Sequence, residues 1–298
     1  MILSHSKKAI TAGIALASLL CASLLAHAPQ AHQKSCLWKV RSKTSVMYLL
    51  GSIHILKKEA YPLSPAIEEA FNDSRKLVVE VDLDGEGQNA TRALMLSKGL
   101  YSGGRTLSQT ISSQAFEKAK VACRELGLSL DRMSFFKPWL LAITLTALKL
   151  QTLGFDPEYG IDKYFSDKAR TTGKSIIGLE TLEYQVGRFE AMSEQLQESL
   201  LLQTLDELET VESEFDQIVN SWSKGDLTGL ETLLESFKEY PEAYQLLLVE
   251  RNRNWMPQIE SLLKDKQNCL VVVGAAHLIG EDGLVRMLKD RGYSPEQL

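Results

Sequence analysis

Two apolar stretches near opposite ends of the chain share one pattern, and this repetition constrains the fold more than any other feature. Residues 47–54 end in a Gly-x-x-His motif, and residues 270–277 end in a second one. Each stretch has the length and apolar content of a buried strand. Glycine lets the backbone turn where a side chain would clash. The sequence therefore predicts two strands that deliver His54 and His277 just past a turn.

These two histidines are also nearly the only ones in the mature chain. The sequence contains five histidines, and the other three lie at or before residue 32, within or at the edge of an N-terminal leader. One histidine after a strand is commonly a hydrogen-bonded core residue. Two histidines in matching settings favour a shared functional role instead.

Residues 1–32 have the features of a secretory signal peptide. Two lysines form a basic n-region, residues 9–25 form an apolar h-region that is short for a membrane span, and residues 26–28 form an Ala-x-Ala cleavage motif. The proline that follows disfavours cleavage, so an uncleaved anchor that holds the protein to a membrane through residues 9–25 is the alternative. We expect an exported protein, periplasmic or extracellular, with one domain over residues 33–298.

Composition and cysteine spacing exclude some classes of function. A net charge of -5 leaves no basic excess to neutralise phosphates, so we expect no nucleic-acid partner. The cysteines after the leader match no zinc framework. Cys36 and Cys269 each precede a predicted strand, and export would permit a disulfide between them. The alternative is that all of these thiols are inert.

Strands are predicted near both ends of the chain, with helices between them. A hairpin at residues 37–50, a helix at residues 65–72 and a strand at residues 76–81 suggest a βαβ unit with parallel pairing. Further strands are predicted at residues 175–180 and 269–273, and most of the remaining chain has helical periodicity. We expect an α/β fold with a central, mostly parallel sheet, helical connections and a large helical insertion or cap.

Four predicted strands end in a histidine or glutamate. These residues are His54, Glu80, Glu180 and His277. Ligands of open α/β sheets bind outside the carboxyl ends of the strands. Imidazoles and carboxylates together suit a divalent cation such as Zn²⁺, Mn²⁺ or Co²⁺, which can activate water while a free carboxylate serves as base. Glu80 follows an apolar run, so it is costly to bury unpaired, whereas Glu180 could instead begin a helix.

Two further residues have alternative interpretations. Asp162 could cap the helix that follows it or contribute to a pocket. Arg251 could bind an anionic substrate group, hold a carboxylate, or lie on a solvated basic helix face. The motifs of serine hydrolases, phosphate-binding loops, dinucleotide-binding folds and His-Glu-x-x-His metalloproteases do not occur in the sequence.

The chain resembles the TraB/GumN family, which is related to the Tiki metalloproteases. The resemblance rests on the paired Gly-x-x-His motifs and on shorter matches in the family's order, which cover nearly all of residues 36–298. These matches are Trp38-Lys39-Val40, Val79-Glu80, Lys137-Pro138-Trp139, Gly160-Ile161-Asp162, Gly178-Leu179-Glu180-Thr181 and Glu250-Arg251-Asn252. The family usually has threonine where this chain has Ser52.

The resemblance implies a divalent metal, Mn²⁺ or Co²⁺, bound by His54 and His277, with Glu80 as ligand or base and Glu180 as a second catalytic carboxylate. We therefore expect an exported metal-dependent hydrolase, specifically a peptidase that acts on a peptide or another small substrate. The alternatives are a non-catalytic cell-envelope or ligand-binding protein on the same scaffold, and a metal-dependent esterase of non-peptide substrates.

Overall fold

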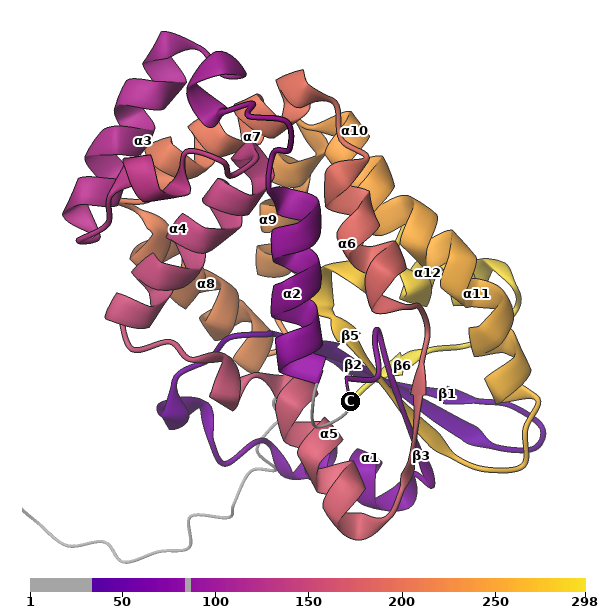
Figure 1. The fold of residues 1–298 in the computed structure, drawn as a ribbon. Helices are drawn as coiled ribbons and strands as arrows, with labels where there is room; N and C mark the ends of the chain where they lie inside the picture. The colour runs from indigo at the N-terminus through magenta and orange to yellow at the C-terminus, as the bar shows by residue number, and fades with distance from the viewer. Residues whose placement is uncertain (1–33, 84–86) are drawn as a thin grey trace, which may run out of the picture. The chain divides into compact units, whose positions relative to one another are not determined.

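Within residues 34–83 and 87–298, which the computed structural model describes, the chain forms a six-stranded sheet in the order β4-β3-β5-β2-β1-β6 (Figure 1). The strands are β1 (Leu37–Arg41), β2 (Val46–Ser52), β3 (Lys76–Val79), β4 (Ser175–Gly178), β5 (Cys269–Gly274) and β6 (Glu296–Gln297). The predicted signal peptide at residues 1–32 lies outside the described residues. In the part that is described, no helix is long and apolar enough to cross a membrane.

The pairing of the strands confirms the predicted α/β fold with a mostly parallel sheet. β2, β5, β3 and β4 run parallel to one another, while β1 and β6 run antiparallel. The predicted hairpin is formed by β1 and β2, with Leu37 opposite Leu50. β3 and β4 end earlier than predicted, at Val79 and Gly178, and the short β6 was not predicted.

The predicted parallel pairing of β2 with β3 is wrong, because β5 lies between them. Leu49 of β2 and Val78 of β3 both pair with Val271 of β5. Residues 269–273 are buried almost completely. A strand that is apolar on both faces is stabilised most when helices cover both faces and other strands pair with both edges. The last core strand of the sequence is therefore central to the sheet.

Helices cover the sheet and extend into a cap. α1 (Pro65–Asp73), α5 (Ile161–Thr172), α11 (Glu250–Leu263) and α12 (Leu284–Asp290) share one apolar cluster with the strands. The remaining helices continue into the cap (Figure 1), and several of them also contribute residues to that cluster. They are α2 (Gly87–Gly99), α3 (Ser113–Glu125), α4 (Pro138–Thr152), α6 (Leu182–Glu190), α7 (Glu194–Glu207), α8 (Val211–Ser223), α9 (Leu227–Lys238) and α10 (Pro241–Tyr244).

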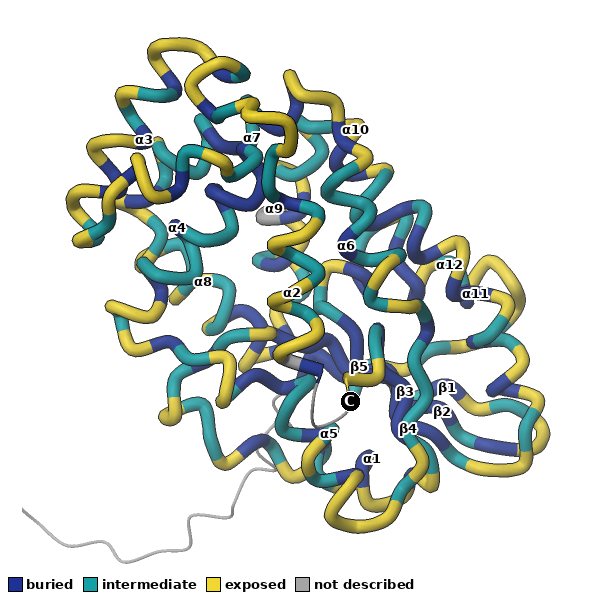
Figure 2. Tube along the Cα trace, in the orientation of Figure 1, coloured by how far each residue is buried: buried dark blue, intermediate teal, exposed yellow. Residues whose placement is uncertain are grey.

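The helix predicted at residues 65–72 is confirmed as α1. Ser64 is the N-cap residue and Pro65 begins the helix, where its missing N–H costs nothing. Ile67, Ala70 and Phe71 are buried against the core. Figure 2 shows burial concentrated in the strands and along the inner sides of the helices.

Of the two alternatives for the cysteines, the disulfide between Cys36 and Cys269 is wrong and the free thiols are confirmed. β1 runs antiparallel to β2, so Cys36 lies beside Gly51 at the carboxyl end of β2, where its carbonyl accepts from the Gly51 N–H at 2.8 Å. Cys269 pairs with Met47 at the opposite end of the same strand. The two thiols therefore lie at opposite ends of the sheet. Cys36, Cys123 and Cys269 are free and buried.

Candidate functional site

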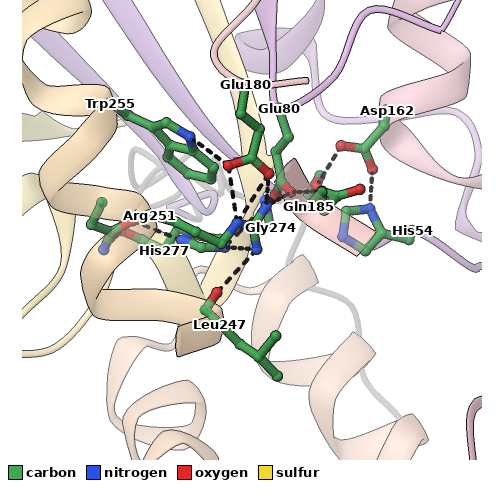
Figure 3. A network of polar contacts seen from close by, with 12 residues as sticks. His54, Glu80, Asp162, Glu180, Gln185, Leu247, Arg251, Trp255, Gly274 and His277 are labelled. Carbon is green, nitrogen blue, oxygen red and sulfur yellow. Dashed lines mark hydrogen bonds and ion pairs between the residues drawn. The ribbon is translucent and has the colours of Figure 1, made fainter. Parts of the chain in front are cut away.

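The central position of β5 brings the four predicted strand-end residues to one edge of the sheet (Figure 3). Ser52 of β2 pairs with Gly274 of β5, so the two Gly-x-x-His motifs emerge side by side. Glu80 follows β3 on the other side of β5. Beyond the ends of β3 and β4, the N–H of Glu180 donates to the carbonyl of Glu80 at 2.9 Å. The site thus draws one residue from each of four adjacent parallel strands.

Gly274 forms the floor of the site. A Cβ atom at this position would lie 3.3 Å from Glu80 Oε1, 3.6 Å from His54 Nε2 and 3.6 Å from His277 Cδ2. The Gly274 N–H donates to Glu80 Oε1 at 2.7 Å. A carboxylate oxygen and two imidazole edges therefore converge over a position that carries no side chain.

His54 is oriented by Asp162. His54 Nδ1 donates to Asp162 Oδ2 at 2.7 Å, and the Ser52 hydroxyl donates to Asp162 Oδ1 at 2.9 Å. Asp162 raises the pKa of His54 through its negative charge and its hydrogen bond, against the effect of desolvation. This contact fixes the ring and leaves Nε2 facing the site, which is the arrangement that orients metal-binding histidines.

Gly160 packs closely against the backbone of His54, and this places Asp162 beside the His54 side chain. A Cβ atom at Gly160 would lie 2.2 Å from the His54 carbonyl oxygen. Gly160 is also the N-cap residue of α5, so Asp162 lies in the first turn of the helix rather than at its cap. The cap interpretation of Asp162 is therefore wrong, and its carboxylate borders the cavity described below.

His277 is buried and oriented by Asn252 of α11. Asn252 Nδ2 donates to the carbonyls of His277 at 3.1 Å and Asp282 at 2.8 Å, so its Oδ1 accepts from His277 Nδ1 at 2.7 Å. Burial lowers the pKa of His277 to about 3, although the nearby charge of Glu80 acts in the opposite direction. The ring is therefore neutral near pH 7 and carries its lone pair on Nε2.

Glu80 is buried as an ionised carboxylate. Oε2 accepts from Arg251 Nη2 at 2.5 Å and from Gln185 Nε2 at 3.0 Å, and Oε1 accepts from the Gly274 N–H. Burial alone would raise the pKa of Glu80, but the charge of Arg251 and the hydrogen bond from the Gly274 N–H help to lower it to about 2. The predicted cost of burying Glu80 is thus offset by charge-assisted hydrogen bonds.

Arg251 connects the two glutamates. Its Nη2 donates to Glu180 Oε1 at 2.7 Å as well as to Glu80, and its Nε donates to Glu180 Oε1 at 3.0 Å. Trp255, one helical turn along α11, donates to Glu180 Oε2 at 2.9 Å. Arg251 is 7% exposed, so the interpretation as a solvated helix face is wrong, and it holds carboxylates instead. The Glu180 carboxylate is therefore held by Arg251 and Trp255.

A cavity of about 610 Å³ lies beside this cluster. His54, Glu80, Asp162 and Gln185 contribute to its lining, together with apolar residues that include Leu83. A space of this size accommodates a segment of a peptide or a small molecule. The histidine–glutamate edge of the sheet is therefore accessible to a substrate.

The residues fit a divalent cation by chemical type. His54 and His277 are each held through Nδ1, and Glu80 is ionised, which gives two imidazole donors and one carboxylate donor. Within residues 34–83 and 87–298, however, no three His, Cys, Asp or Glu side chains are grouped as a complete metal site. At His277, Nε2 lies 3.0 Å from Arg251 Nη1.

Several residues of the site were not assigned a role from the sequence. They are Ser52, which supports Asp162, Gln185, which supports Glu80, Asn252, which orients His277, and Trp255, which supports Glu180. Asn252 adjoins Arg251, and Trp255 follows Arg251 at helical spacing. These spacings were visible in the sequence, but the partners of these side chains lie far away along the chain.

Comparisons with known proteins give a family match and distant relatives. A model of the TraB/PrgY/gumN family matches residues 36–297. The chain is 27% identical over 250 residues to the uncharacterized protein YbaP of Escherichia coli strain K12, which covers 81% of this chain and 87% of the relative. It is 24% identical over 322 residues to a metalloprotease TIKI homolog of Amphimedon queenslandica, which covers 90% of this chain and 62% of the relative. No solved structure matches the chain.

Proposed function

The chain belongs to the TraB/PrgY/gumN family, and we propose that this member is an exported metal-dependent hydrolase that cleaves peptides. The observation that carries the proposal is the convergence of His54 Nε2, Glu80 Oε1 and the His277 ring over Gly274. Imidazole and carboxylate donors in one place suit Zn²⁺, Mn²⁺ or Co²⁺. The distant relative named as a metalloprotease supports the same chemistry.

In this proposal His54, His277 and Glu80 hold the cation. A divalent cation at this edge would supply the Lewis acidity that makes water nucleophilic near neutral pH. Asp162 and Asn252 keep Nε2 of the two histidines directed at the site, because each accepts from Nδ1. Glu80 remains ionised, and its Oε1 keeps a lone pair that can bind the cation or accept a proton from water.

We assign Glu180 a positioning role in place of the catalytic role expected from the sequence. Its carboxylate oxygens accept from Arg251 and Trp255. Both oxygens are thus engaged away from Gly274. Glu180 fixes the guanidinium, and the guanidinium in turn fixes Glu80.

The cavity beside His54 and Glu80 supports a substrate of peptide size, and the features of residues 1–32 support export to the periplasm or the extracellular space. An extended peptide can lie along a cavity of about 610 Å³ with its carbonyl group toward His54. The acidic overall charge continues to argue against nucleic acid as a substrate.

The test is cleavage of a peptide library by the purified protein with Mn²⁺, Co²⁺ or Zn²⁺. We expect metal-dependent cleavage that falls by at least about a hundredfold in His54→Ala and Glu80→Gln, because each removes a donor of the site. Glu190→Gln is the matched control, since Glu190 is an ion-paired glutamate that contacts Lys98 and Lys137 instead of a residue of the site.

Equal cleavage by all of these proteins, or cleavage that survives chelation of the metal, would contradict the proposal. A parallel screen with ester substrates tests the substrate class. Hydrolysis of esters without any cleavage of peptides would retain the metal centre and overturn the peptidase assignment.

A further inference from the structure

Arg251 occupies the lone pair with which His277 would bind a metal. Nδ1 of His277 carries the proton that Asn252 accepts, so Nε2 carries the only lone pair of the ring nitrogens. That lone pair faces Arg251 Nη1 at 3.0 Å. One imidazole nitrogen cannot accept a hydrogen bond and bind a cation through the same lone pair. The contact with Arg251 and the coordination of a metal by His277 are therefore mutually exclusive.

The other contacts of Arg251 do not conflict with a metal. Nε and Nη2 donate to Glu180, and Nη2 also donates to Glu80 Oε2. Oε1 of Glu80 faces Gly274. It accepts from the Gly274 N–H, lies 3.9 Å from His277 Nε2, and keeps a second lone pair. Competition is thus confined to Nη1, whose second partner is the carbonyl of Leu247 at 3.0 Å.

The Arg251 guanidinium would keep other partners if Nη1 left His277. Glu180 and the Leu247 carbonyl would still accept from it, and the guanidinium carbon lies 4.8 Å from the centre of the Trp255 ring. The same ring contacts His277, with the two ring centres 4.5 Å apart. A small displacement of Arg251 along Trp255 therefore exchanges its partner without exposing the charge or leaving Glu180 unpaired.

We propose that Arg251 competes with the metal at His277, so that metal loading requires Arg251 Nη1 to leave His277 Nε2 while Glu180 and Trp255 retain the guanidinium. The inference rests on the proposed metal site. In metal-free protein Arg251 supplies the positive charge that two buried carboxylates need. In metal-loaded protein a cation would add its positive charge beside Glu80 Oε1, while Arg251 Nη2 could still donate to Glu80 Oε2 and to Glu180.

The test is a titration of purified wild-type protein, Arg251→Gln and Arg251→Lys with Zn²⁺, Mn²⁺ and Co²⁺ by isothermal calorimetry. We expect Arg251→Gln to bind metal roughly 10- to 100-fold more tightly, because a charge-assisted hydrogen bond and a like charge are both removed. Arg251→Lys keeps the charge but has a single nitrogen in place of the planar fork, so we expect a smaller gain of a few-fold.

Arg188→Gln is the matched control. Arg188 is also a partly buried arginine that pairs with a glutamate, but its partners are Glu250 and the Tyr184 ring instead of a histidine. We expect its metal affinity to equal that of the wild type. An affinity of Arg251→Gln equal to or weaker than the wild type would overturn the competition. If Arg251→Gln does not fold, the affinity of Arg251→Lys decides, and no gain there would overturn the proposal.

A second measurement needs no substitution. His54 and His277 are the two histidines of residues 33–298, so nitrogen NMR of their imidazoles can follow each ring as Zn²⁺ is added. We expect Nε2 of both rings to shift. A shift at His54 with no change at His277 would overturn the competition while leaving a metal site in place. An absence of metal binding in every variant would instead overturn the proposed metal site, and this inference with it.

Discussion

The contact between His54 and Asp162 gives the sharpest test of the metal site. Asp162→Asn keeps the shape of the side chain and one acceptor oxygen, but removes the negative charge that lies 2.7 Å from His54 Nδ1. Substitutions of such supporting residues commonly weaken metal binding by about 10- to 100-fold. The His54 side chain is 62% exposed, so solvent screens part of the charge, and we expect a loss of about tenfold.

The same substitution should change the protonation of His54. Asp162 is the main cause of the raised pKa of His54. A raised pKa means that the imidazolium is stabilised in the folded protein, and this stabilisation is lost as the pH rises through that pKa. In Asp162→Asn the pKa should therefore fall toward the ordinary value for histidine. An NMR titration of the His54 resonances measures this shift directly.

Asp167→Asn is the matched control for both measurements. Asp167 lies on the same helix and borders the same cavity, but it pairs with Lys163 rather than with a histidine. We expect it to leave both the metal affinity and the pKa of His54 unchanged. If Asp162→Asn binds Zn²⁺ as tightly as the wild type and leaves the pKa of His54 where it was, Asp162 does not orient a metal ligand, and the reasoning fails.

Three other predictions concern stability and thiols. Asn252→Ala should lower the free energy of unfolding by roughly 2–4 kcal/mol in urea titrations, since buried partners at His277 and Asp282 lose their hydrogen bonds; an unchanged midpoint would contradict this. Gly160→Ala should cost about 2 kcal/mol through its clash with the His54 carbonyl, whereas the unobstructed helical Gly187→Ala should be neutral or stabilising. In the absence of reductant, the three buried cysteines should react with a thiol reagent only after the protein has been denatured. A buried cysteine that still fails to react in the denatured protein would indicate a disulfide.

The sequence was a good guide to the strand-end residues because the relevant signals are local. Each of His54, Glu80 and His277 follows an apolar run within a few residues, and a buried run that stops at a polar group marks the end of a strand. Parallel strands place their carboxyl ends at one edge of a sheet. The presence of these residues at one edge therefore required no knowledge of the order of the strands.

The order of the strands and the role of Arg251 could not be predicted in the same way. The sequence contains no local sign that β5 would lie between β2 and β3, because that choice depends on burying both faces and both edges of β5 at once. Arg251 lies on a helix far along the chain from Glu80 and Glu180. Its burial depends on two carboxylates that are adjacent only after β3 and β4 have paired.

The central position of β5 also makes the site depend on the completed sheet. β5 provides Gly274, whose N–H holds Glu80, and it leads directly to His277. The β1–β2 hairpin is local and can form early, whereas the pairing of Met47–Ser52 with Cys269–Gly274 closes most of the chain into one loop and is correspondingly slow. Until that pairing forms, His54 has neither the second imidazole nor the fixed carboxylate beside it. While β5 is unpaired, the residues of the site are therefore present but not brought together. The proposed metal centre can load only after the last core strand has inserted into the sheet.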